Sequence, residues 1–230
     1  MKFKRITDEV RHHYRREGAT EVLTRAIHRL YESVGPHRTR AVFRTRINRI
    51  RGYDVPLDPM ATVYVDPNSI EYSTNTRFRP VLRHIGRVEG GDWDLDPVPL
   101  DSEATARGLR QRFEDGLDWE KTDYFAMLIE SNESELGCSS IKDAHRRCAY
   151  LDQLYDRMKT EGYQVHRKVR PPEEIQRSHH QTTPLEITVH VNRNETYLLQ
   201  DGNHRLSMAQ LIGFDEIPAI VCVRHKQAVS

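Results

Sequence analysis

The strongest structural signal in the sequence lies in its C-terminal part, where two apolar strand-like runs enclose a short polar joint and a helical pattern. LEITVHV (185–191) alternates as a strand, Asn192 to Glu195 form a turn, and TYLLQ (196–200) reads as the second strand of a hairpin. A helix is expected to begin at about His204 and to stop at Gly213. IPAIVCVRH (217–225) is typical of a buried strand. The sequence therefore predicts a β-hairpin, a helix and a strand in succession.

The joint between hairpin and helix is Asp-Gly-Asn-His-Arg (201–205). The first N–H groups of a helix lack intrahelical partners and concentrate partial positive charge, so they can hold an anion. Gly202 allows a sharp turn, Arg205 offers a forked donor, and His204 offers a titratable one. Two interpretations stay open. The joint is either a phosphate cradle or a simple helix cap, in which Asp201 or Asn203 caps the helix and His204 and Arg205 are exposed.

The first 52 residues are strongly basic. They contain fourteen Lys or Arg and five Asp or Glu, a net charge of +9, whereas the whole chain carries only +1. Residues 7–34 read as a helix that ends at Gly35-Pro36, and a second basic stretch follows at 39–52. In that stretch, Val42, Phe43, Ile47 and Ile50 are expected on one side and the arginines on the other. The basic side is either a solvated face or a surface for nucleic acid or an anionic membrane.

Further elements are expected in the middle of the chain. Residues 53–60 resemble a proline-rich linker, and residues 61–72 a short strand that runs into a turn at Asp66 to Asn68. The acid-rich stretch 86–100, which contains GGDWD, is expected to be a loop. Helices are expected at about 102–115, at 119–131 and at 141–161, and an exposed loop at 167–184. The first of these helices begins at Ser102 and carries Glu103 in its first turn.

Residues 186–225 resemble the core of the ParB/sulfiredoxin superfamily, in which a β-hairpin ending in a Gly-x-x-Arg motif precedes a helix, Ile-Pro and a strand. Residues 62–70 are similar to the first strand of that fold. The resemblance implies an α+β protein with a small ParB/sulfiredoxin-like mixed sheet. Its domain would span 58–230 and contain a helical insertion at about 101–162, and residues 1–57 would be a basic helical N-terminal extension.

The residues at the position of this joint differ between the branches of the superfamily. In sulfiredoxins a cysteine follows the glycine, whereas here Asn203 stands there, so sulfinic-acid reduction is not expected. The chromosome-partition clamps carry Gly-Glu-Arg-Arg. Here Asn203 replaces the Glu of that motif and His204 replaces its first Arg, so the match to this branch is weak. The free-serine kinases carry Asp-Gly-His-His-Arg, and Asp201, Gly202, His204 and Arg205 match it. This resemblance implies a nucleotide-binding, kinase-like phosphotransferase that uses ATP or ADP, with CTP as a further candidate, together with Mg²⁺.

By the same resemblance, Gly202, Asn203, His204 and Arg205 would hold the nucleotide phosphates. Asp201 would help to place Mg²⁺ or the hydroxyl of a small or lipid-linked acceptor. The glutamate that serves as general base in the kinase branch is not placed by the motif. The candidates for it are Glu71, Glu89, Asp92 and Asp94, and Asp92 would join Asp201 at the metal. The catalytic set expected from the sequence is therefore Asp201, His204, Glu89, Asp92 and Asp94. The alternative for GGDWD is a turn with Trp93 packed into the core.

Two other functions remain as alternatives. One is a ParB-like, nucleotide-switched binding module that engages DNA or an anionic membrane through residues 1–52. The other is a ParB-like nuclease, which requires a metal-binding cluster of Asp92, Asp94 and Asp201. The sequence has no run of about 18 apolar residues, no secretory signal and no CxxC pair among its three cysteines. We therefore expect a cytoplasmic protein that is not transmembrane. It would be peripheral to the membrane if the basic segment binds lipid.

Overall fold

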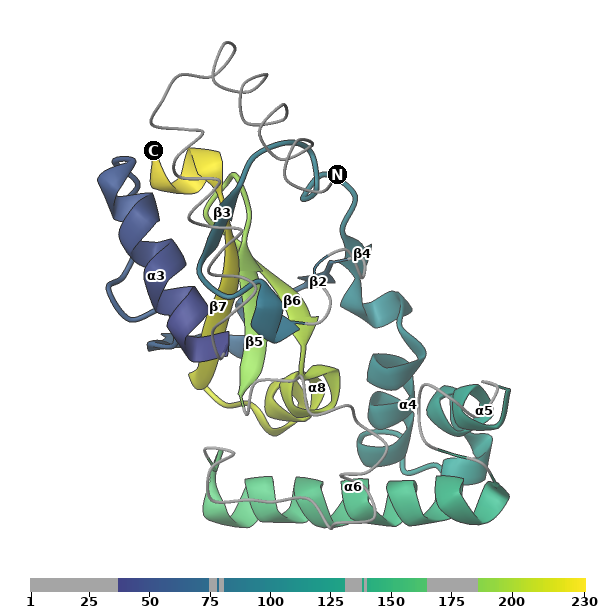
Figure 1. Cartoon of the computed structure of the whole chain (residues 1–230). Coiled ribbons are helices and arrows are strands. Elements are labelled where there is room, and N and C mark those ends of the chain that lie inside the picture. The colour runs from purple at the N-terminus through teal and green to yellow at the C-terminus, as the bar shows by residue number, and fades with distance from the viewer. Residues whose placement is uncertain (1–36, 75–77, 79–80, 131–137, 139, 165–185) are drawn as a thin grey trace, which may run out of the picture.

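The computed structural model describes residues 37–230, apart from 75–77, 79–80, 131–137, 139 and 165–185. The described residues form an open mixed sheet of seven strands together with five α-helices, and the helices lie on both faces of the sheet (Figure 1). This arrangement is consistent with the α+β class expected from the sequence. The helix expected at 7–34, its boundary at Gly35-Pro36 and the loop expected at 167–184 lie outside the described residues.

The sheet is built around its longest strand, the last one in the chain. The strands are β1 (Thr62–Val65), β2 (Tyr72–Ser73), β3 (Arg87–Glu89), β4 (Val98–Pro99), β5 (Ile187–Val191), β6 (Tyr197–Asp201) and β7 (Ile217–His225). Their order is β1-β7-β5-β6-β2-β4, and β3 also pairs with β7. The pairs β7–β5, β7–β3 and β6–β2 are parallel, whereas β7–β1, β5–β6 and β2–β4 are antiparallel.

The helices are α3 (His37–Ile50), α4 (Ala104–Phe113), α5 (Asp123–Glu130), α6 (Ile141–Glu161) and α8 (Asn203–Ile212). Short 3₁₀ turns connect several elements: η1 (Pro67–Ser69), η3 (Val81–Arg83), η4 (Leu100–Ser102), η5 (Trp119–Lys121) and η6 (Lys226–Val229). Within the part of the chain described here, no helix is both long and apolar enough to cross a membrane.

Strand β7 is apolar on both sides because both faces of the sheet are covered. Ile217, Ala219 and Val221 belong to the core that the sheet shares with α4, α5, α6 and α8. Ile220 and Cys222 point to the opposite face, where Ala41 of α3 completes a second, smaller core. Side chains alternate between faces along a strand, so a strand covered on both sides reads as a continuous apolar run.

Helix α3 forms where the sequence predicts a helix, but the predicted buried face is wrong. Ile50, expected on the apolar face, is 85% exposed. The buried side instead carries Ala41, Arg44, Thr45 and Asn48. Arg44 donates to the Ile85 carbonyl at 2.8 Å and Asn48 to the Gly86 carbonyl at 2.9 Å. These bonds satisfy backbone oxygens at the edge of the sheet, which is why polar side chains occupy this face.

The remaining local predictions are largely confirmed. Strand β7 and helix α6 have the predicted bounds, the hairpin strands and α8 agree within two residues, and α4 and α5 lie inside the predicted helical stretches. Gly162 and Gly213 end α6 and α8 with positive φ angles of 77° and 81°. The expectation of a continuous loop at 86–100 is wrong, because β3 and β4 add short strands there by pairing with β7 and β2.

Candidate functional site

The Asp-Gly-Asn-His-Arg joint lies where β6 ends at Asp201 and α8 begins at Asn203. Gly202 between them has a φ of 100°, and a Cβ atom added to it would lie 2.9 Å from Cγ1 of Ile187 on the neighbouring strand. Both the left-handed backbone and the close approach therefore require glycine. Asp201 accepts a hydrogen bond from the Gly202 amide at 2.9 Å. Gly202 has no side chain to cap the helix, so the N-terminus of α8 is a suitable place for an anion.

A carboxylate reaches this joint from a distant part of the chain. Glu103, the residue before α4, accepts hydrogen bonds from the hydroxyl of Ser73 on β2 and from the side-chain amide of Asn203. Ser207, one turn along α8, donates to Oδ1 of Asn203 at 3.2 Å and fixes the orientation of that amide. Glu103 is thus held beside the first residue of α8. The sequence placed it only in the first turn of a helix and gave no signal for its contact with residue 203.

His204 is hydrogen-bonded to a side chain of α5, which in turn contacts α6. Its Nε2 lies 2.8 Å from the hydroxyl of Tyr124 on α5, and Nε of Arg147 on α6 donates to the same hydroxyl at 2.7 Å. Tyr124 is only 1% exposed. Burial raises the pKa of Tyr124 to about 12, although the Arg147 guanidinium acts in the opposite direction. The hydroxyl therefore keeps its proton at neutral pH. Neither Tyr124 nor Arg147 was a candidate in the sequence.

The close approach of α4 and α5 positions Tyr124. A Cβ atom added to Gly108 of α4 would lie 2.2 Å from Cβ of Tyr124 and 2.6 Å from its amide nitrogen. Such contacts are far shorter than van der Waals packing allows, so only glycine fits at this position.

Arg205 forms an ion pair inside the protein. Its NH1 lies 3.7 Å from Oε2 of Glu186, and the two side chains are 16% and 6% exposed. The guanidinium expected to hold phosphate therefore already neutralises a buried carboxylate just before β5. Of the four residues proposed for phosphate, the structure places Gly202, Asn203 and His204 at the start of α8 with Arg205 directed to Glu186.

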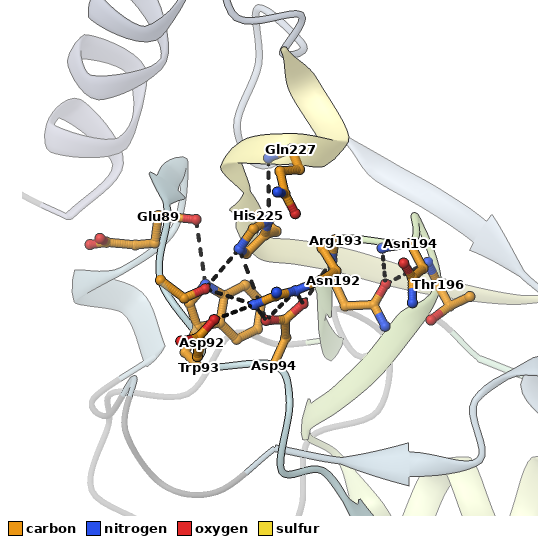
Figure 2. Close-up of polar contacts among 11 residues, drawn as sticks. Glu89, Asp92, Trp93, Asp94, Asn192, Arg193, Asn194, Thr196, His225 and Gln227 are labelled. Carbon is orange, nitrogen blue, oxygen red and sulfur yellow. Dashed lines mark hydrogen bonds and ion pairs between the residues drawn. The ribbon is translucent and has the colours of Figure 1, made fainter.

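Asp92 and Asp94 belong to a separate cluster, which joins the loop before β4 to the hairpin turn between β5 and β6 (Figure 2). Arg193 binds Asp94 through Nε at 3.0 and 3.1 Å, through NH2 at 2.8 Å, and through its backbone amide at 2.9 Å. The same guanidinium reaches Asp92 at 3.0 Å. Burial alone would raise the pKa of Asp94, but the hydrogen bonds from Arg193 outweigh it and lower the pKa below its usual value.

This cluster and the joint lie at opposite ends of β6. Arg193 is in the turn before the strand and Asp201 is its last residue. At about 3.3 Å per residue, the strand separates its two ends by roughly 13 Å. Asp92 and Asp201 therefore do not fit a single Mg²⁺ ion, contrary to the expectation. Nor are Asp92, Asp94 and Asp201 assembled as the nuclease alternative requires. Among the residues described, no three His, Cys, Asp or Glu side chains gather in a way that could hold a metal ion.

Glu89 and Glu71 are the other two carboxylates proposed as the general base. Glu89 on β3 pairs with Arg87 at 2.7 Å, and Glu71 is exposed. Trp93 is 7% exposed, with its ring 5.3 Å from that of Phe78. The GGDWD segment is therefore a turn with its tryptophan in the core and its second aspartate in a buried ion pair. That is the alternative that the sequence left open.

Gln200, the residue before Asp201, connects two further polar side chains. The ring of His190 on β5 is fully buried, accepts a hydrogen bond from the Val223 amide at Nδ1 (3.2 Å), and lies 2.7 Å from Oε1 of Gln200 at Nε2. Thr74 donates to the same oxygen at 2.8 Å. Since Nδ1 accepts, Nε2 carries the proton. Burial lowers the pKa of His190 to about 4, so its ring is neutral at physiological pH.

The described site thus combines a left-handed glycine, the start of a ten-residue helix, a carboxylate and a histidine bound to a buried tyrosine. In comparisons with known proteins, no family model matches this chain, and neither a curated protein nor a solved structure matches it. The geometry of the joint and the motif at 201–205 are therefore the features that bear on the function of this protein.

Proposed function

We propose that this protein is a nucleotide-dependent phosphotransferase that transfers a phosphoryl group from ATP or ADP to a hydroxyl of a small or lipid-linked acceptor. The observation that carries the proposal is the position of Glu103, whose carboxylate is bound to the first residue of α8 directly after Gly202. A helix start suited to phosphate and a carboxylate that can accept a proton thus lie beside each other. The finer fold assignment, a ParB/sulfiredoxin-like sheet, is part of this proposal and rests on the hairpin, joint, helix and strand at 187–225.

The proposed roles follow from the donors and acceptors present. The amides at the start of α8 and the ring of His204 bind phosphate oxygens, because both are hydrogen-bond donors close to the helix N-terminus. The acceptor hydroxyl attacks the terminal phosphorus and loses its proton to the carboxylate of Glu103. The bond from that phosphorus to the bridging oxygen breaks, and the nucleotide leaves with one phosphate fewer. Ser73 and Asn203 hold the carboxylate in place for this step.

The experiment starts with nucleotide binding. Thermal shift and calorimetry with ATP, ADP, CTP and GTP, each with and without Mg²⁺, identify the donor nucleotide. Consumption of that donor is then measured with a panel of hydroxyl acceptors. Glu103→Gln keeps the size of the side chain and loses the base. We expect it to lower turnover by about 10²–10⁴-fold while nucleotide affinity changes by only a few fold.

The matched control is Asp101→Asn, since Asp101 lies two residues away and forms an exposed ion pair with Arg110. It should leave turnover unchanged. The proposal is wrong if no nucleotide stabilises the wild-type protein, or if Glu103→Gln turns over the donor at the wild-type rate. Arg205→Ala is a less suitable probe, because it would also remove the ion pair that Arg205 makes with the buried Glu186.

A second candidate function is contact with an anionic membrane through α3. Arg46, Arg49 and Arg51 are exposed at the C-terminal end of this helix, and the apolar side chain of Ile50 between them is 85% exposed. Exposed basic and apolar side chains in one place suit the interface of an anionic bilayer. Arg46→Glu/Arg51→Glu should weaken sedimentation with phosphatidylserine vesicles, and the same change at exposed Arg83 should not. Equal binding by both variants, or binding only to duplex DNA, would exclude the membrane.

A further inference from the structure

The contact between His204 and Tyr124 determines which ring nitrogen of the histidine carries the proton. The two rings meet edge to face, 5.2 Å apart at 86°, and the tyrosine hydroxyl lies 2.8 Å from Nε2. The other polar neighbour of that hydroxyl among the described residues is Nε of Arg147, at 2.7 Å. The direction of these two hydrogen bonds can be assigned from what each group is able to donate.

A guanidinium group only donates, so the oxygen of Tyr124 accepts the bond from Arg147. The hydroxyl proton then needs an acceptor, because an unpaired polar hydrogen in the interior costs about 1–3 kcal/mol. Nε2 of His204 is the acceptor within reach. A nitrogen that accepts has no proton, and the neutral ring therefore carries its proton on Nδ1.

We propose that Tyr124, oriented by Arg147, is a positioning residue that fixes His204 as the neutral Nδ1–H tautomer and thereby makes Nδ1 a donor to phosphate oxygens bound at the start of α8. The benefit of Nδ1–H to nucleotide binding rests on the proposed function, whereas the tautomer itself does not. Helices α5 and α6 would then contribute to the site, because they supply the two residues that determine which ring nitrogen of His204 carries the proton.

The tautomer can be read directly. Long-range ¹H–¹⁵N correlation spectra of ¹⁵N-histidine-labelled protein at about pH 8, where an ordinary histidine is neutral, distinguish a protonated from a bare ring nitrogen. The His204 signals are assigned by their loss in His204→Gln. We expect a protonated Nδ1 and a bare Nε2 in the wild type, and a mixture of tautomers in Tyr124→Phe. Affinity for ATP, measured by calorimetry, should fall about tenfold in that variant, the size expected for one impaired hydrogen bond.

Two further variants separate this effect from a general loss of structure. Tyr124→Phe/Arg147→Met also removes the guanidinium that donates to the Tyr124 hydroxyl, and it should show the same mixture of tautomers. Tyr155→Phe removes a hydroxyl from a tyrosine that stacks on Phe113 at 3.9 Å, and it should leave both the tautomer and the ATP affinity unchanged.

Each result decides one of the two proposals. A wild-type spectrum with the proton on Nε2 overturns this inference even if ATP binds. A wild-type spectrum with the proton on Nδ1, lost in both Tyr124 variants, supports it. If that spectrum is found but no nucleotide binds, the phosphotransferase proposal fails while the assigned role of Tyr124 stands. If Tyr124→Phe does not fold, the wild-type spectrum and the double variant still provide the test.

Discussion

His190 illustrates how buried polar side chains in this protein are satisfied. The pairing of β5 with β7 shifts in register around His190, and the amide of Val223 binds the imidazole at 3.2 Å. The ring donates in turn to Gln200. A protonated ring would lose the bond from Val223, because Nδ1 would then be a donor. Burial in this setting lowers the pKa of His190 to about 4.

This pKa predicts a loss of stability in weak acid. Below about pH 6.5 the unfolded chain takes up a proton at residue 190, whereas the folded protein does not do so until about pH 4. The free energy of unfolding should therefore fall by about 1.4 kcal/mol per pH unit between these values through this group alone. Urea titrations from pH 7 to pH 4.5 should give a shallower slope for His190→Gln than for wild type. The exposed His145→Gln serves as the control, and equal slopes for His190→Gln and wild type would contradict the assignment.

Arg193 and Asp94 form the pair whose disruption should be most costly. The Asp94 side chain is 1% exposed and that of Arg193 is 23% exposed, so Arg193→Ala leaves a carboxylate in the interior without its partner. We expect a loss of roughly 3–5 kcal/mol in the free energy of unfolding, and a double variant Arg193→Ala/Asp94→Ala less destabilised than the sum of its parts. Denaturant titrations of the four proteins measure this coupling. The exposed pair Arg110–Asp101 is the control and should contribute less than about 1 kcal/mol.

The sequence predicted the position of Asp201 to Arg205 at a strand-to-helix joint, because glycine and a change of hydrophobic period are local signals. It could not predict that Glu103 and Tyr124 reach this joint, since their contacts cross roughly 80–100 residues and depend on how α4 and α5 pack. The same limit explains Asp92 and Asp94. A turn rich in glycine, acid and tryptophan has the composition of a site, and only its contact with Arg193 shows that it is a structural ion pair.

At the scale of elements, the packing of α4 on α5 positions Tyr124 and so links these two helices to the joint. Gly108→Ala places a methyl group against Tyr124, and we expect it to destabilise the fold by about 1–3 kcal/mol or more. It should also displace the hydroxyl that binds His204, so the tautomer signal of His204 should change as well. Gly90→Ala is the control, because the nearest atom to its Cβ would be 3.9 Å away and no positive φ is required there. Equal thermal stability of the two variants would contradict this packing.

The elements that the sequence predicted well have long, regular patterns. Helix α6 with its 21 residues and strand β7 with its nine were predicted with their observed bounds. Strands β3 and β4 were missed because two or three residues carry no period, and they form only by pairing with strands from other parts of the chain. The face of α3 was mispredicted for another reason. Its buried arginine and asparagine are paired with carbonyls of the segment 85–86, and a hydrophobicity pattern does not register such pairs.

At the scale of the whole molecule, the basic N-terminal region includes part of the fold. Helix α3 adds Ala41 to the second core and binds two carbonyls beside β3. Deleting residues 1–52 should therefore lower the melting temperature well below that of a protein that lacks only residues 1–36. Differential scanning calorimetry of the two truncated proteins tests this. If both melt at the same temperature, α3 contributes little to the stability, and the basic region can be treated as a separate segment.

The place of β7 in the chain has a consequence for biosynthesis. Strands β1, β3 and β5 all pair with β7, yet all three are translated before it, and β1 precedes it by roughly 150 residues. At the ribosomal rate of about 5–20 residues per second, β7 is synthesised on the order of ten seconds after β1. Until then, the nascent chain exposes strand edges and apolar surface to its surroundings. Translation speed and chaperone supply should consequently influence how much active protein a cell obtains from this sequence.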